Sequence, residues 1–175
     1  METVKIDFEP CKSIGDIQNL LKEHLIISEW DDKNPDVLLR QLKELNQCEI
    51  YLRGTNLLPN NISEYMKQII SIFNKVEEMY NNIDVNIMDV VTIDFTGVKS
   101  VYEAHKLISE KLDFPDWYGG NLPALWDLLY REIPTYEVHM KGTEAVSDNL
   151  LPFMKQVIEI FRRAETDNSV KLILE

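Results

Sequence analysis

The chain has 175 residues, of which 45% are apolar and 27% charged, values ordinary for a soluble globular protein and unlike those of a disordered chain or coiled coil. No apolar run approaches the roughly 20 residues needed to cross a bilayer, and residues 1–10 have neither the basic nor the apolar region of a secretory signal. The formal net charge of −12 repels nucleic acid and anionic membranes and speeds encounter with basic proteins, but taken alone it is explained most simply as an aid to solubility and names no partner.

The reactive residue types are scattered. Cys11 and Cys48 have neither CxxC nor metal-ligand spacing, so we expect free thiols and a cytoplasmic protein. His24, His105 and His139 fall in no catalytic pattern, and the sequence contains no phosphate-binding loop. We therefore expect a protein that is not an enzyme and that uses no metal or cofactor.

The first half of the chain predicts the element order β-α-α-β-α-β. Runs rich in β-branched residues indicate strands, and apolar residues at helical spacing indicate helices. The predicted elements are, in order, Val4–Phe8, Ser13–Leu25, Asn34–Leu45, Glu49–Arg53, Ile62–Tyr80 and Val85–Met88.

The second half predicts the same order. Val90–Phe95 has the composition of a buried strand, and Ser100 with Glu103 forms the capping box of a helix. Asn121 is the predicted N-cap of a second helix. The remaining elements are a strand at Thr135–Met140, a helix opening at Asp148 or Asn149, and a strand at Val170–Leu174.

The two halves are related by sequence. Residues 4–42 match residues 91–129 at 13 of 39 positions, with an offset of 87. After a shift of one residue, 49–73 match 137–161 at 10 of 25 positions. We interpret the chain as a tandem duplication of residues 1–88 and 89–175, each half with a net charge of −6. Strands that alternate with helices predict an α/β fold in which each half is a three-stranded parallel sheet packed with helices.

Residues 115–127 read Pro-Asp-Trp-Tyr-Gly-Gly-Asn-Leu-Pro-Ala-Leu-Trp-Asp. This segment resembles the defining segment of the barstar family, an aromatic pair followed by Gly-x-Asn-Leu-x-Ala-Leu-Trp-Asp. Flanking features agree, including the Ser-led first helix, a Val-x-x-x-Phe-Arg pattern in the last helix and the closing apolar strand. The resemblance covers nearly all of residues 90–175, and residues 1–88 share it only through the duplication, as a degenerate copy.

The resemblance implies a non-catalytic inhibitor that occludes the cleft of a basic nuclease, typically a ribonuclease toxin to which it confers immunity. In this family the loop and the second helix bind the nuclease. The positions that carry the motif, and hence the expected partner-binding residues, are Trp117, Tyr118, Gly119, Gly120, Asn121, Pro123, Trp126 and Asp127.

Structural roles compete with binding at several of these positions. Asn121 is expected to cap a helix, and the two glycines suit a turn. Two adjacent aromatic residues in a loop cannot easily both face inward, so we expect Trp117, Tyr118 or both to be exposed as an interface anchor.

The sequence also departs from the family. Pro123 and Arg163 stand where well-studied members carry acidic residues. The first copy has Asp36 at the position of Pro123, and together with Asp31 and Asp32 it forms a possible second surface. The alternative function is therefore an interaction module that binds a protein other than a nuclease or that self-associates.

Overall fold

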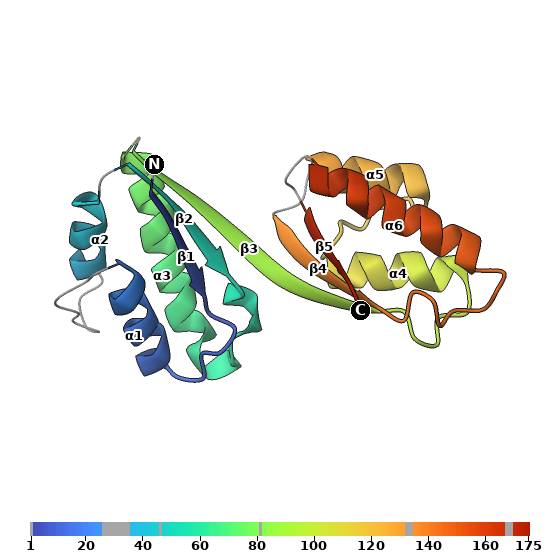
Figure 1. Ribbon diagram of the computed structural model, residues 1–175, viewed down its shortest axis with the longest axis horizontal. Coiled ribbons are helices and arrows are strands. Elements are labelled where there is room, and N and C mark those ends of the chain that lie inside the picture. The colour runs from blue at the N-terminus through green and yellow to red at the C-terminus, as the bar shows by residue number, and fades with distance from the viewer. Residues whose placement is uncertain (1, 26–35, 46, 81, 132–134, 167–169) are drawn as a thin grey trace. The chain divides into compact units, whose positions relative to one another are not determined.

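The computed structural model of the protein describes residues 2–25, 36–45, 47–80, 82–131, 135–166 and 170–175 (Figure 1). By its internal contacts the chain divides into two compact units, Met1–Asp89 and Val90–Glu175. Among the described segments, no helix combines the length and the apolar character needed to cross a membrane.

The first unit has the predicted order of elements. Strand β1 pairs in parallel with β2, and β2 pairs in parallel with residues 83–88 of β3. A 3-10 turn, η1, follows β2. The elements are β1 (Glu2–Asp7), α1 (Ile14–Leu25), α2 (Asp36–Lys43), β2 (Cys48–Arg53), η1 (Thr55–Leu57), α3 (Asn60–Met79) and β3 (Ile83–Asp94).

The second unit repeats this order, beginning with the later part of β3. Strand β4 pairs in parallel with β5, and the backbone N–H of Phe95 donates to the carbonyl of Lys141 at 2.9 Å, where β3 and β4 end. The remaining elements are α4 (Val101–Lys111), α5 (Leu122–Arg131), β4 (Tyr136–Lys141), α6 (Leu151–Thr166) and β5 (Val170–Leu174).

The prediction of an α/β fold with parallel strands is confirmed, but one boundary was wrong. The sequence predicted separate strands at 85–88 and 90–95, whereas β3 is a single strand of 12 residues. No Gly or Pro interrupts it, and Asp89 stays within the strand, where its half-buried carboxylate accepts a hydrogen bond from Thr55 Oγ1 at 3.2 Å. The strands follow the order β1-β2-β3-β4-β5, and β3 contributes residues to both units.

Both units begin their first helix in the same way. Ser100 Oγ accepts the backbone N–H of Glu103 at 3.1 Å, and the Glu103 carboxylate accepts the N–H of the residue before the cap at 2.8 Å. In the first unit, Ser13 Oγ accepts the N–H of Asp16 at 3.2 Å, and the Asp16 carboxylate accepts the equivalent N–H at 2.9 Å. The predicted capping box is thus confirmed in the second unit and has a counterpart 87 residues earlier.

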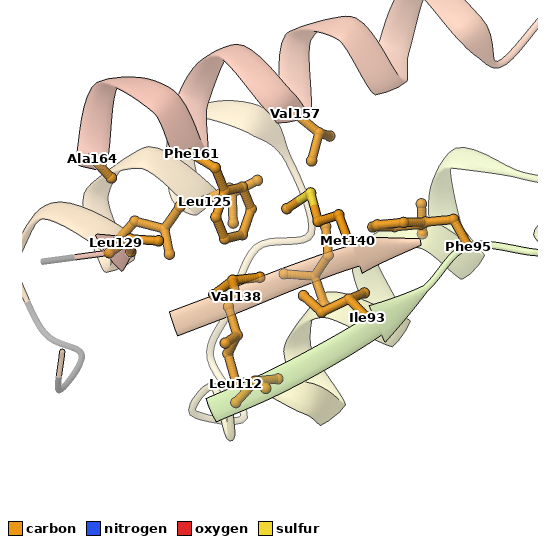
Figure 2. Packing of buried hydrophobic residues seen from close by; sticks show 14 of the residues in the cluster. Ile93, Phe95, Leu112, Leu125, Leu129, Val138, Met140, Val157, Phe161 and Ala164 are labelled. Carbon is orange, nitrogen blue, oxygen red and sulfur yellow. The ribbon is translucent and has the colours of Figure 1, made fainter. Parts of the chain in front are cut away.

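Each unit has its own apolar core, and the two cores use matching positions. The largest fully buried side chains include Phe8 and Phe73 in the first unit and Phe95 and Phe161 in the second. These pairs are separated by the same offsets of 87 and 88 residues that relate the sequences. Figure 2 shows the second core, in which Phe161 and other side chains from α5 and α6 point toward the buried face of β3 and β4.

The other face of β4 carries charge, because alternate side chains of a strand point to opposite faces. Glu137 is only 2% exposed and accepts hydrogen bonds from Lys171 Nζ at 2.7 Å and from His139 Nε2 at 2.9 Å. His139 Nδ1 lies 2.6 Å from Glu175 Oε1, and Lys141 Nζ lies 2.8 Å from Glu175 Oε2. The hydrogen bond to Glu175, followed by the interactions with Glu137, raises the pKa of His139.

This network predicts a pH dependence of stability. Because the pKa of His139 is raised in the folded state, its contribution is complete below the unfolded value near 6.5 and is lost as the pH rises through the higher folded value. We expect His139→Gln to lower the free energy of unfolding by about 1–2 kcal/mol at pH 6 and by less at pH 9. Urea unfolding of both proteins at each pH measures these losses. An equal loss of unfolding free energy at pH 6 and pH 9 would contradict a stabilising role for the protonated His139.

Candidate partner-binding surface

The loop between α4 and α5 begins with a tight helix end. Asp113 adopts a left-handed backbone with φ of 51°, and the N–H of Phe114 donates back to the Ser109 carbonyl at 2.9 Å. This is the hydrogen bond of a Schellman motif, which ends a helix and reverses the chain. Phe114 is consequently buried, and the loop leaves α4 in a defined direction.

The two adjacent aromatic residues of the loop point in different directions. The Tyr118 side chain packs against the core of the second unit, and its N–H donates to the Pro115 carbonyl at 2.9 Å. The Trp117 side chain is 65% exposed. Of the two rings, the Trp117 ring is therefore the one that is mostly exposed to solvent.

Tyr118 belongs to a small aromatic cluster under the loop. Its ring makes edge-to-face contacts with Phe114, at 5.0 Å between ring centroids, and with His105 of α4, at 5.8 Å. His105 also contacts Phe153 of α6 at 5.2 Å. The Tyr118 hydroxyl lies 2.6 Å from His105 Nδ1. Burial lowers the pKa of His105 and raises that of Tyr118, so both groups are neutral at pH 7.

The glycines and Asn121 form the entry to α5. Gly120 has a φ of 58°, a conformation that favours glycine, and a Cβ on Gly119 would lie 2.9 Å from Asn121 Nδ2. Asn121 Oδ1 accepts the N–H of Ala124 at 2.9 Å, and its Nδ2 donates to the Gly119 carbonyl at 3.1 Å. Asn121 is thus the N-cap of α5, which accounts structurally for its presence in the motif.

The exposed side of α5 continues the surface. Pro123 and Asp127 are exposed, and helical spacing puts them on one side of the helix with Trp126. The Trp126 ring is half-buried and stacks on Tyr130, with ring centroids 5.5 Å apart and planes inclined by 19°. The opposite side of α5 carries the buried Leu125, Leu128 and Leu129.

Two residues of this region were missed by sequence reasoning. Tyr130 is 49% exposed, and its place four residues after Trp126 was a usable signal for the stack. In the sequence, His105 is one of three scattered histidines and shows no sign of a role in this region. Its contact with Tyr118 joins a helix to a loop 13 residues later, and no local pattern indicates that contact.

The possible second surface lies mostly outside the described residues. Asp31 and Asp32 are not among them, and Asp36 opens α2 with a side chain that is also outside them. Arg163, one of the departures from the family, donates from Nε to Glu159 at 3.1 Å on α6. Within the described part of the chain, no group of three or more His, Cys, Asp or Glu side chains is arranged to hold a metal ion.

Comparison with known proteins finds relatives of the second unit. The family model described as Barstar (barnase inhibitor) matches residues 88–174, which include the loop and α5. A Bacillus subtilis (strain 168) protein named "Putative ribonuclease inhibitor YrdF" is 33% identical over 89 residues. That alignment covers 49% of this chain and 97% of the Bacillus protein. The chain therefore belongs to the barstar family, through the domain at residues 88–174.

Proposed function

We propose that this protein is a non-enzymatic, cytoplasmic inhibitor that occludes the active-site cleft of a basic nuclease toxin, most simply a ribonuclease. The binding surface of the proposal consists of the loop 113–121 and the exposed side of α5, hereafter the recognition surface. It contains the eight motif residues together with Tyr130. Cys11 and Cys48 are both buried and form no disulfide, which suits a reducing compartment.

One observation carries the proposal. Trp117 is 65% exposed on a loop whose next residue, Tyr118, is anchored in the domain. Exposing a large ring to water is unfavourable unless a partner covers it, and aromatic residues held rigidly at a surface are typical interface anchors. The exposed carboxylates of Asp116 and Asp127 flank this region and would attract a basic cleft.

The proposal also includes that the chain contains two copies of one barstar-like domain, of which residues 1–88 are the degenerate copy, and that the two copies have different roles. Matching cores and matching capping boxes support a duplication. Only the second copy has the Trp-Tyr-Gly-Gly loop, and Arg40 stands in the first copy where the second has Asp127. We therefore assign nuclease binding to the second copy.

The direct test is inhibition of barnase, which serves as the probe because the family is described by that target. We expect the protein to reduce RNA cleavage by barnase stoichiometrically and to cleave no nucleic acid itself. Pancreatic ribonuclease is the control for nonspecific binding to a basic protein. Failure to inhibit barnase at micromolar concentrations would contradict a barnase-type target and favour the alternative, an interaction module with another partner.

Trp117 provides the first mutational test. We expect Trp117→Ala to weaken binding of barnase by about 2 kcal/mol, or about 30-fold in Kd, because it removes a central aromatic anchor. The stability of the inhibitor should change by less than about 0.5 kcal/mol, because the ring is exposed. Calorimetric titration measures the Kd. The matched control is Tyr102→Ala, an exposed ring on α4, and an equal loss from both variants would refute the role of Trp117.

Asp127 provides the electrostatic test. We expect Asp127→Asn to slow association with barnase at low salt and to flatten its salt dependence, since exposed charges are screened over about 10 Å at 0.1 M ionic strength. Electrostatic steering of this kind is best known from the barnase–barstar complex itself. Asp148→Asn, an exposed carboxylate before α6, is the control. A wild-type association rate that is independent of salt would favour an apolar interface.

The assignment to the second copy is tested by paired variants. The double variant Trp117→Ala with Asp127→Asn should abolish inhibition, because it removes both the aromatic anchor and the charge of the recognition surface. Replacing Asp31, Asp32 and Asp36 together with asparagine should leave inhibition unchanged. The reverse result in the barnase assay would place the nuclease-binding surface on the first copy.

A further inference from the structure

We propose that His105 is a positioning residue that holds the loop 113–121, hereafter the recognition loop, in its binding-competent shape by fixing Tyr118. This inference rests on the function proposed above and assigns a role in it to a residue outside the recognition surface. His105 is 3% exposed and therefore touches no partner itself.

The contacts of His105 join three parts of the domain. Its Nδ1 lies 2.6 Å from the Tyr118 hydroxyl, and its ring packs edge-to-face against Tyr118 and against Phe153, at the start of α6. The loop thus contacts α4 and, through the imidazole, α6. Because Tyr118 is tethered, the backbone of its neighbour Trp117 is restricted, and the exposed ring is offered to a partner with less conformational entropy to lose.

The hydrogen bond has a definite physical role. Burial keeps both His105 and Tyr118 neutral at pH 7. The phenol and the imidazole therefore form a hydrogen bond that buries no charge. If the hydroxyl were removed, Nδ1 would lose this partner in a site that admits little water, and an unsatisfied buried polar atom costs about 1–3 kcal/mol. The bond therefore favours the closed arrangement of the loop over alternatives in which Tyr118 leaves the cluster.

The first unit places a different side chain at the same position. Gln18 precedes His105 by 87 residues, and its Nε2 donates to the Tyr65 hydroxyl on α3 at 3.2 Å. Tyr65 corresponds to Phe153 at the offset of 88. In the first unit the polar atom at this position is thus bonded to the last helix, whereas in the second unit it is bonded to the loop.

The test compares variants that remove the hydrogen bond between residues 105 and 118 with a variant that keeps a polar atom at the position of His105 Nδ1. His105→Leu and Tyr118→Phe each remove one partner, and His105→Asn keeps a polar atom at the δ position. Hydrogen exchange of the residue-118 amide, which donates to the Pro115 carbonyl, reports on loop order without any partner. Amides of β4 report on the stability of the domain. Kd for barnase is measured on the same samples.

We expect Tyr118→Phe and His105→Leu each to accelerate exchange of the residue-118 amide about 10-fold, while β4 amides change by less than about 2-fold. The double variant should be no worse than either single variant, because both remove one bond. His105→Asn should restore exchange to within about 3-fold of wild type. Weakening of barnase binding should follow the same order, with about 10-fold losses for the two disruptive variants.

The two proposals fail in different ways. If wild type does not bind barnase but the exchange pattern is as expected, the proposed target is wrong and the positioning role of His105 stands. If the residue-118 amide is unaffected, if β4 amides accelerate equally, or if His105→Asn behaves like His105→Leu, the positioning role is overturned whatever the affinity.

Discussion

Burial of one face of short parallel strands under helices is the constraint on which each unit depends. A unit of fewer than 90 residues encloses only a small core, so nearly every inward position must be apolar and well packed. Ile93 of β3, Phe95 directly after that strand, Val138 of β4 and Phe161 of α6 all belong to the core of the second unit in this way, and each is fully buried. The core is built almost entirely from side chains of the helices and strands. A loop that extends away from the core must therefore be held in place by contacts of its own.

The recognition loop has three such contacts, and each has a separate chemistry. The positive φ of Asp113 turns the chain at the end of α4, Tyr118 anchors the middle in an aromatic cluster, and Asn121 ties the end to α5 as its cap. With both ends and the middle held, Trp117 remains exposed without being disordered. A rigid exposed ring loses little entropy on binding, which is the property that distinguishes an anchor residue from an exposed hydrophobic residue without a role.

Much of this architecture was predictable because its signals are local. The capping box at Ser100, the cap at Asn121 and the apolar spacing of the helices involve residues within four positions of one another, and the structure has all of them. The continuity of β3 was missed because the repeat divided the chain between residues 88 and 89, and the bond that Thr55 donates to the Asp89 carboxylate joins residues 34 positions apart. The inward direction of Tyr118 likewise involves a contact with His105, 13 residues earlier, which no sequence period reveals.

The two units differ at the positions that the fold does not constrain. Core positions tolerate only apolar replacements of similar size, which is why Phe8 and Phe95 match. On the open face of the strands, Tyr51 donates to Glu49 in the first unit, whereas His139 contacts the equivalent Glu137 in the second. Both arrangements satisfy a carboxylate, so the fold accepts either, but only the second adds an imidazole, whose pKa the neighbouring carboxylates raise. The two units can therefore differ in the charge of this face while their cores use matching apolar positions.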